Sequence, residues 1–171
     1  PKQRLSDKFP GVLTNQYMTE EQKAFMKKLF KDANLKLVSF GVAYANNEKE
    51  IEDLCKFVKE FGCDRVLTEC PVGLFPVWEK VGKKYGVTMG IHNHNGPNKY
   101  WNPAYIFPLV KDYEFVKMNP DVGHMARAGI NPIDALKTYE GKISSVHFKD
   151  LSEICAKNKP AVYGKGVLDT K

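Results

Sequence analysis

The chain has 171 residues, of which 43% are hydrophobic and 27% charged, and its formal net charge is +6 at pH 7. This composition is typical of one soluble α/β domain with an ordinary apolar core. No apolar run is long enough to cross a bilayer and no signal-peptide pattern is visible, so no membrane partner is expected. Because the chain begins at Pro1 rather than Met, the compartment stays open between cytoplasm and periplasm.

The charged residues and the cysteines carry little functional information. The lysines are spread along the chain, so solvated helix faces account for most of them, although the positive balance would help to attract anionic ligands. The cysteines form no C-x-x-C pair and predict neither a disulfide framework nor a zinc ribbon, so we interpret them as buried small apolar residues. They are Cys55, Cys63, Cys70 and Cys155.

The elements alternate along the chain after an irregular start. Residues 1–18 show no regular pattern and contain a turn at Pro10-Gly11. Thr19 then caps a helix, with Gln22 completing a capping box. The predicted helices begin near residues 20, 48, 74, 103 and 132, and the predicted strands cover 35–42, 65–69, 87–92, 115–118 and 143–147. Residues 151–171 are expected to be mostly loop.

Strand starts lie about 22 to 29 residues apart, and strict β-α alternation at that spacing favours parallel strands joined by helices. A doubly wound open sheet and a (β/α)8 barrel both fit this pattern. No glycine-rich phosphate fingerprint follows the first strand, which weakens the doubly wound alternative. Polar residues at the ends of four successive strands favour a TIM barrel. A closed barrel needs about 250 residues, so residues 1–171 predict a single, incomplete TIM-barrel domain of five β-α units.

All four histidines of the chain close a predicted strand or lie just past one. His92 and His94 follow the apolar run of residues 87–91 in phase, so both fall on one face of the strand. In a parallel barrel the strand ends share one mouth, where two imidazoles and one or two carboxylates would form a common ligand set for Zn²⁺, Mn²⁺, Co²⁺ or Fe²⁺. The polar residues at this mouth would be Glu69, His92, His94, Asp121, His124, His147, Lys149 and Asp150.

Each of these residues also has a structural interpretation. A single histidine at a strand end is more often a hydrogen-bonded structural residue. Glu69 could be a solvated carboxylate, Asp121 could shape a turn after Asn119-Pro120, and Lys149 could be a surface lysine. Trp101 could belong to the core or to a lid rather than stack on a sugar. The structural interpretation weakens for the set as a whole, because it requires all four histidines to meet at one end of the sheet by chance.

Several segments resemble a known family. They are Lys36-Leu-Val-Ser-Phe-Gly-Val42, Ile91-His-Asn-His94 with Tyr100-Trp101-Asn102-Pro103, Asp121-Val-Gly-His124, Val146-His-Phe-Lys-Asp150 and Tyr163-Gly-Lys-Gly-Val-Leu-Asp169. Together they resemble the sugar phosphate isomerase/epimerase family of xylose isomerase-like TIM barrels, to which endonuclease IV is related.

The resemblance implies one divalent metal ion, of Zn, Mn, Co, Fe or Mg, held at the strand ends. Asp121 and His147 match the family's aspartate and histidine ligands, and His124 matches a histidine that contacts metal or substrate. His92 stands where many relatives carry a glutamate ligand in a Glu-Asn-His pattern. Glu69 could supply that carboxylate, so the resemblance implies a site of Glu69, His92, Asp121 and His147.

The resemblance also implies an incomplete barrel. Relatives begin with two further strands and end with an eighth, and these have no counterpart in the present sequence. Five parallel strands would leave two open edges, which must normally be covered or paired. We therefore expect either a homo-oligomer or additional barrel segments.

The function implied is a metal-dependent isomerase or epimerase of a sugar, sugar phosphate or keto-sugar. Glu69, His94 and Lys149 would be catalytic, and His124, Trp101 and Asp150 would bind the substrate. Alternatives on the same site are a keto-sugar dehydratase or lyase and a catalytically incomplete metal- and sugar-binding fragment. An endonuclease IV-like enzyme is the weaker alternative, because its three zinc ions need more ligands, and no nucleic-acid partner is expected.

Overall fold

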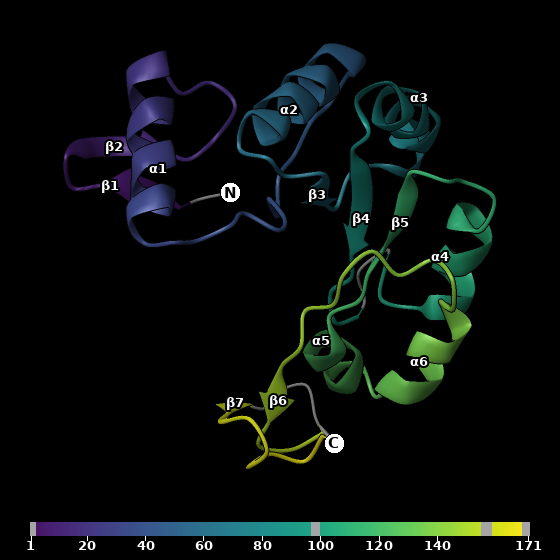
Figure 1. The fold of residues 1–171 in the computed structure, drawn as a ribbon. Helices are drawn as coiled ribbons and strands as arrows, with labels where there is room; N and C mark the ends of the chain where they lie inside the picture. The colour runs from purple at the N-terminus through teal and green to yellow at the C-terminus, as the bar shows by residue number, and fades with distance from the viewer. Residues whose placement is uncertain (1–2, 97–99, 155–158, 169–171) are drawn as a thin grey trace. The chain divides into compact units, whose positions relative to one another are not determined.

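A computed structural model describes residues 3–96, 100–154 and 159–168 (Figure 1). The chain forms two compact units, Pro1–Met89 and Gly90–Lys171, built from helices and short strands. Within the described ranges, no helix has both the length and the apolar character needed to cross a membrane. The expectation of an α/β chain is confirmed, while the described residues contain no closed barrel.

The N-terminal residues form a hairpin, so the prediction of an irregular start is wrong. Strands β1 (Arg4–Ser6) and β2 (Phe9–Leu13) pair antiparallel beside helix α1 (Glu20–Asp32), and the rings of Phe9 and Phe25 lie 5.2 Å apart (Figure 1). Pro10-Gly11 was interpreted as a turn, but Pro10 lies within β2. A two-stranded sheet tolerates this proline because each strand has an unpaired side.

The capping signals identify the helices of the first unit correctly. Thr19 Oγ1 accepts the backbone N–H of Gln22, and the Gln22 side chain accepts that of Thr19, which completes the predicted capping box of α1. The Asn47 side chain accepts the backbone N–H of Glu50 at 3.0 Å and caps α2 (Glu48–Glu60). A short 3₁₀ turn, η1 (Val72–Leu74), leads into α3 (Phe75–Tyr85).

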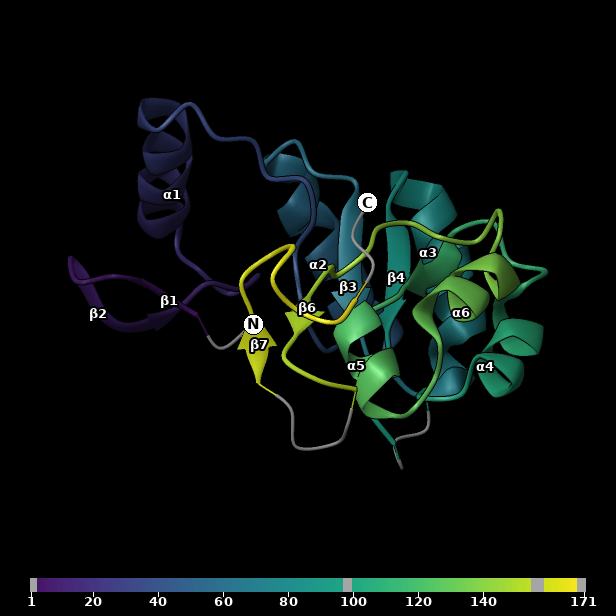
Figure 2. The same cartoon turned by 90° about the horizontal axis from the view of Figure 1, so that it is seen from below.

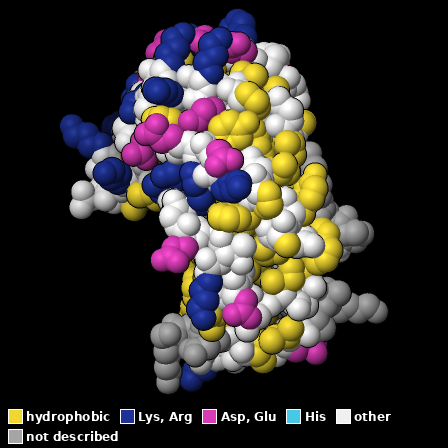
Figure 3. Space-filling view, turned by 90° about the vertical axis from the view of Figure 1, so that its right-hand side faces the viewer, with side chains coloured by type: hydrophobic (Ala, Val, Ile, Leu, Met, Phe, Trp, Pro, Cys, Tyr) yellow, Lys and Arg dark blue, Asp and Glu magenta, His cyan; other side chains and the backbone are white. Residues whose placement is uncertain are grey.

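Helices α2 and α3 pack against each other (Figure 1), and the side chains that they bury form a largely apolar layer. The buried side chains of this layer include Ile51, Leu54, Val58, Trp78 and Val81. At the rim, Lys80 pairs with Glu48 and Lys84 with Glu52, each at 2.7 Å. On the upper part of the face drawn in Figure 3, Lys and Arg side chains likewise lie among acidic side chains.

The predicted strand over 35–42 is largely absent. Only Phe40 forms a bridge, parallel to Val66, and the side chains of Leu35 and Val38 are each 63% exposed. The backbone continues beside the next strand through the hydrogen bond from Ala43 N–H to Leu67 O at 2.8 Å. A Cβ on Gly41 would lie 2.4 Å from Leu67 O, so this close approach requires glycine.

The central sheet has three strands in the order β3 (Arg65–Thr68), β4 (Thr88–His92), β5 (Val116–Asn119). Successive strands are separated in the chain by helices, as the β-α alternation predicted. The fifth predicted strand, 143–147, is present only as two parallel bridges, Met118 with Ile143 and Asp121 with His147. Three of the five predicted strands are thus formed, while the other two are reduced to single paired residues.

The described residues of the second unit include three short helices, each with a polar N-cap. They are α4 (Pro103–Val110), capped by Asn102; α5 (Val122–Arg127), capped by Asp121; and α6 (Pro132–Thr138), capped by Asn131. Helix α6 contacts both α4 and α5. The two-residue strands β6 (Asp150–Leu151) and β7 (Pro160–Ala161) pair antiparallel near the end of the described chain (Figure 2).

The cysteine prediction is confirmed for the three cysteines that the structure describes. Cys55, Cys63 and Cys70 are buried thiols. Burial raises the pKa of the Cys55 thiol to about 12, so this side chain behaves as a small apolar group. Cys155 lies outside the described residues.

Candidate metal centre

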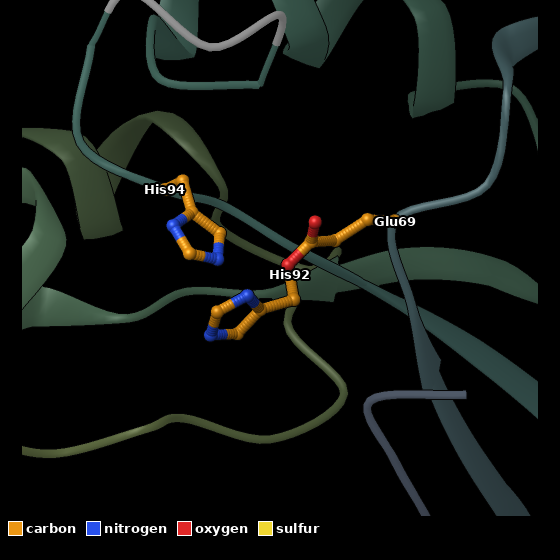
Figure 4. Close-up of side chains that lie close together, drawn as sticks. All are labelled: Glu69, His92 and His94. Atoms are coloured by element: carbon orange, nitrogen blue, oxygen red, sulfur yellow. The ribbon is translucent and has the colours of Figure 1, made fainter. Parts of the chain in front are cut away.

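Strand β4 ends in three polar residues. His92 is its last residue and is buried, Asn93 is buried directly after it, and His94 is half-buried. The imidazole rings of His92 and His94 approach edge to face, with centroids 5.2 Å apart and planes at 79° (Figure 4). The structure therefore brings together the two histidines that the sequence predicted to share a strand face.

The focus of the candidate centre is the carboxylate of Asp121, which is fully buried at the N-terminus of α5. Its Oδ1 atom accepts the backbone N–H of His124 at 3.0 Å, as an N-cap. Its Oδ2 atom faces four cationic or imidazole groups: Lys149 Nζ at 2.5 Å, His92 Nε2 at 3.3 Å, His147 Nδ1 at 3.7 Å and His124 Nε2 at 3.9 Å. One oxygen atom is thus structural, and the other is directed into a cluster of nitrogen donors.

The surroundings stabilise the charged form of this carboxylate. Burial alone would raise the pKa of Asp121, but contacts from His147, His92 and Lys149 and the backbone N–H of His124 outweigh it and hold the pKa well below its usual range. A carboxylate that is buried and ionised is costly unless it is compensated. The cluster therefore keeps a negative charge in place at a buried position.

His124 is held in its neutral form at neutral pH. Burial is the main cause that lowers its pKa to about 4, with the nearby charges of Lys149, His94 and His92 acting in the same direction and the charge of Asp121 opposing them. Its ring stacks on that of His94, with centroids 4.3 Å apart. Its Nδ1 atom is buried and has no hydrogen-bond partner in the described part of the chain.

Lys149 reaches Asp121 through a gap left by a glycine. A Cβ on Gly123 would lie 2.9 Å from Lys149 Cβ and 3.1 Å from its Cδ. Any larger residue at position 123 would therefore displace the lysine. The side chain of Lys149 is 38% exposed and that of His147 is 36% exposed, so the cluster is open to solvent on this side.

Three of the four predicted metal ligands meet in a geometry that fits a metal ion. Ligand atoms of His92, Asp121 and His147 all lie within 4.8 Å of one another. Two imidazole nitrogens and one carboxylate oxygen form a mixed donor set suited to Zn²⁺, Mn²⁺, Co²⁺ or Fe²⁺. The surroundings favour the ionised carboxylate that such an ion requires. The donors thus fit one divalent ion.

Glu69 lies in the first unit, directly after β3, and is half-buried. The hydroxyl group of Tyr44 donates to its carboxylate at 3.3 Å. The roles predicted for Glu69 as fourth ligand and proton acceptor stay predictions. The substrate-binding role of Trp101 also stays a prediction. Trp101 is half-buried and its indole ring lies close to Gly96, where an added Cβ would be 3.1 Å from the ring.

Asp150 is engaged in ordering a loop. Its two carboxylate oxygens accept four backbone N–H groups, from Leu151, Gly164, Gly166 and Leu168, at 2.8 to 3.2 Å. Burial would raise its pKa, but these hydrogen bonds together hold the pKa below its ordinary value. The side chain thus fastens the glycine-rich segment to β6, and its predicted contact with a substrate stays untested.

Sequence reasoning missed one residue of the cluster, Asn93. Alternation along the strand directs its side chain away from the face of His92 and His94, so it gave no functional signal. In the structure its amide group instead forms two hydrogen bonds with the backbone of Asp121.

No protein-family profile matches the chain, and no curated protein sequence matches it. Solved structures do. An uncharacterized protein from Parabacteroides distasonis is 25% identical with a TM-score of 0.73, and the match covers 98% of this chain and 67% of that one. A D-tagatose 3-epimerase-like protein is 15% identical with a TM-score of 0.64, over 78% of this chain and 63% of that one.

A probable 3-DHS dehydratase involved in petrobactin synthesis, from Bacillus anthracis, is 14% identical with a TM-score of 0.68, over 88% of this chain and 69% of that one. A sugar phosphate isomerase/epimerase from Parabacteroides distasonis and endonuclease IV from Thermus thermophilus are similar as well. The chain thus spans about two thirds of the length of the first three structures. The resemblance to xylose isomerase-like TIM barrels is confirmed at the level of fold.

Proposed function

We propose that the chain carries the metal centre of a divalent-metal-dependent sugar isomerase or epimerase. One observation carries the proposal, namely the convergence of His92, His147 and the buried carboxylate of Asp121. The fold likeness adds support, because the similar structures include a D-tagatose 3-epimerase-like protein and a sugar phosphate isomerase/epimerase. Since fold alone does not determine function, the chemistry of the site must carry the argument.

A divalent ion bound at these three residues would polarise a substrate carbonyl and so acidify the neighbouring C–H bond. The chain's own residues would do the rest. Lys149, 2.5 Å from Asp121 Oδ2 and 38% exposed, would stabilise the negative charge that develops on the substrate oxygen. His94, half-buried beside His92, would orient a hydroxyl group by hydrogen bonding.

Proton transfer needs a base, and Glu69 is our candidate. Its carboxylate would take the proton from the carbon next to the carbonyl group and return it to the other face or to the adjacent carbon. The support for this role is its position at the end of β3, the strand next to β4 in the sheet. His92, by contrast, could not act as a base while it is a ligand, because its lone pair would be engaged.

A keto-sugar dehydratase is the second candidate, and one observation favours it. The probable 3-DHS dehydratase has a TM-score of 0.68 to this chain. The same acidified C–H bond and the same base would then expel a hydroxyl group from the next carbon as water, with Lys149 or His94 supplying the proton. The residues required are the same, so only the product distinguishes the two reactions.

Incubation of the metal-loaded chain with keto-sugars in D₂O, followed by product NMR, tests the proposal. Deuterium at the carbon next to the carbonyl without loss of water would support isomerisation or epimerisation, and an unsaturated product would support dehydration. Glu69→Gln should abolish exchange at that carbon while leaving metal content unchanged if Glu69 is the base alone. Exchange that persists at the unaltered rate in Asp121→Asn would contradict a role for the centre.

Tight metal binding with no turnover would favour a binding fragment over an enzyme. An endonuclease IV-like function would instead appear as DNA binding that weakens steeply as salt is raised. We give this function less weight because three zinc ions need more ligands than the cluster around Asp121 offers among the described residues.

A further inference from the structure

Asn93 joins the end of β4 to the residue that begins α5. Its side chain is 1% exposed. The Nδ2 atom donates to the backbone oxygen of Asp121 at 3.3 Å, and the Oδ1 atom accepts the backbone N–H of Asp121 at 2.7 Å. One amide side chain therefore satisfies both polar groups of a single buried residue.

The geometry explains why an amide is needed at this position. Strand β4 ends at His92, so its backbone no longer pairs with the neighbouring strand at the level of Asp121. The Asn93 side chain carries the same donor and acceptor as a peptide unit and takes over that pairing. On the other side of Asp121, His147 N–H donates to Pro120 O at 2.8 Å and Val122 N–H donates to His147 O at 3.1 Å.

The direction of the Asp121 carboxylate follows from these hydrogen bonds on both sides of its backbone. With the backbone held from both sides and Oδ1 engaged by the N–H of His124, the side chain has little freedom, and Oδ2 is left facing His92 and His147. A buried N–H that lost Asn93 would be left without its hydrogen-bond acceptor, which is costly, so the backbone would shift to find another.

We propose that Asn93 is a positioning residue, which sets the Asp121 carboxylate for metal binding without itself contacting metal or substrate. The inference rests on the proposed metal centre. Partners that orient a ligand from behind typically contribute 10- to 100-fold in metal affinity. Loss of the Asn93 amide should weaken binding by about that factor.

A matched control exists in the same sheet. Asn119, the last residue of β5, is also fully buried, and its amide donates to Ser145 Oγ at 2.8 Å. In the part of the chain that the structure describes, its side chain forms no hydrogen bond with Asp121. Replacing either asparagine by alanine removes a buried amide at a strand end, so the two variants should lose comparable stability, while only Asn93→Ala should disturb the metal.

The test loads the unaltered chain, Asn93→Ala and Asn119→Ala with Co²⁺ and records visible absorption and affinity by chelator competition. Asn93→Ala should bind about 10- to 100-fold more weakly and show altered band positions or intensities, whereas Asn119→Ala should keep the spectrum and the affinity. If Asn93→Ala does not fold, Asn93→Ser replaces it in the test, because serine keeps a polar side chain at this position. Asn93→Ser should also weaken Co²⁺ binding. Hydrogen exchange at the Asp121 amide should accelerate in the Asn93 variants alone.

The outcomes separate this inference from the proposed function. If the unaltered chain binds Co²⁺ and the Asn93 variants match it in spectrum and affinity, the positioning role is overturned and the metal centre stands. Equal loss in Asn93→Ala and Asn119→Ala would also overturn it, because the effect would then be one of general stability. If the unaltered chain binds no metal, the proposed function fails, and unchanged amide exchange at Asp121 would show that Asn93 does not hold that residue either.

Discussion

Two regions of the molecule bury their side chains on different physical grounds. The side chains that α2 and α3 bury are largely apolar, and the charged groups of these helices form exposed ion pairs at the rim. The region around Asp121 buries an ionised carboxylate, an asparagine and two histidines. Burial stabilises the first region directly through the hydrophobic effect. In the second, burial opposes the charge, and only a set of specific contacts offsets that cost.

The difference between the two regions indicates which buried groups are explained by function rather than by stability. Apolar packing alone would fold the second unit with fewer costly groups, since replacing buried ion pairs by apolar residues is often neutral or stabilising. A buried carboxylate that four neighbours hold in its charged form is therefore better explained by what it binds than by stability. The following changes should affect the two regions differently.

Leu54→Ala should have the largest effect, and on stability alone. Leu54 is a fully buried residue of α2, and truncating such a leucine costs about 2–5 kcal/mol because it leaves a cavity. Urea unfolding should show this loss, while the affinity of the folded chain for Zn²⁺ stays unchanged. A large loss of affinity in the still-folded variant would mean that the two regions are coupled.

Acid should destabilise the metal-free chain through His124. Its pKa is lowered from 6.5 in the unfolded chain to about 4 in the folded one, so between these values the unfolded state binds more protons. The part of the stability that depends on neutral His124 is therefore fully present above pH 6.5. The free energy of unfolding falls by up to about 3 kcal/mol as the pH drops to 4.

His124→Gln should reduce this dependence. Urea unfolding of the metal-free variant at several pH values between 4 and 7 should give a flatter profile than that of the unaltered chain. An equally steep profile in the variant would show that another group is responsible. The depressed pKa of Asp121 acts in the same direction but at lower pH, below its ordinary range of titration.

Asp121→Asn should remove most metal binding, by about 100-fold or more, because a neutral amide replaces the charged oxygen ligand. The asparagine side chain can still accept the N–H of His124, so α5 keeps its cap. Isothermal titration with Zn²⁺ measures the change. Asp134→Asn, an exposed residue in the first turn of α6, is the control and should bind as the unaltered chain does.

Lys149→Met should strengthen metal binding by about tenfold, because the ammonium group competes for the Asp121 Oδ2 atom and repels a cation. Turnover should fall in the same variant, since the oxygen of the substrate loses its positive partner. Lys137→Met, an exposed lysine of α6, should change neither quantity. Weaker binding in Lys149→Met would contradict the competition.

The sequence was most informative where structure is local. Thr19, Asn47 and Asn131 each cap the helix that follows, because a capping side chain bonds to an N–H only two or three residues away. The helix over Val122–Arg127 was missed because six residues are too few to establish a periodic pattern. The prediction of a strand over 35–42 was largely wrong, because apolar alternation does not indicate whether a partner strand is within hydrogen-bonding distance.

The candidate centre was predictable in outline but not in detail. The sequence predicted that His92, Asp121 and His147 would lie close together, because each follows a predicted strand and parallel strands bring their ends to one edge of the sheet. The sequence did not indicate the contact between Asn93 and Asp121, because the two residues are distant in the chain and the contact depends on where β4 ends. Asp150 was predicted to bind substrate, yet its carboxylate accepts four backbone N–H groups, whose arrangement only the folded loop reveals.

Metal content measured by elemental mass spectrometry tests the central claim most directly. The purified chain, loaded with a divalent transition metal and freed of excess ion, should carry one equivalent, and His147→Ala should carry far less. The proposal rests on His92, Asp121 and His147 forming one site, so the loss must follow from changing any one of them. No bound metal in the loaded, folded chain, or one equivalent that survives His147→Ala unchanged, would contradict the account.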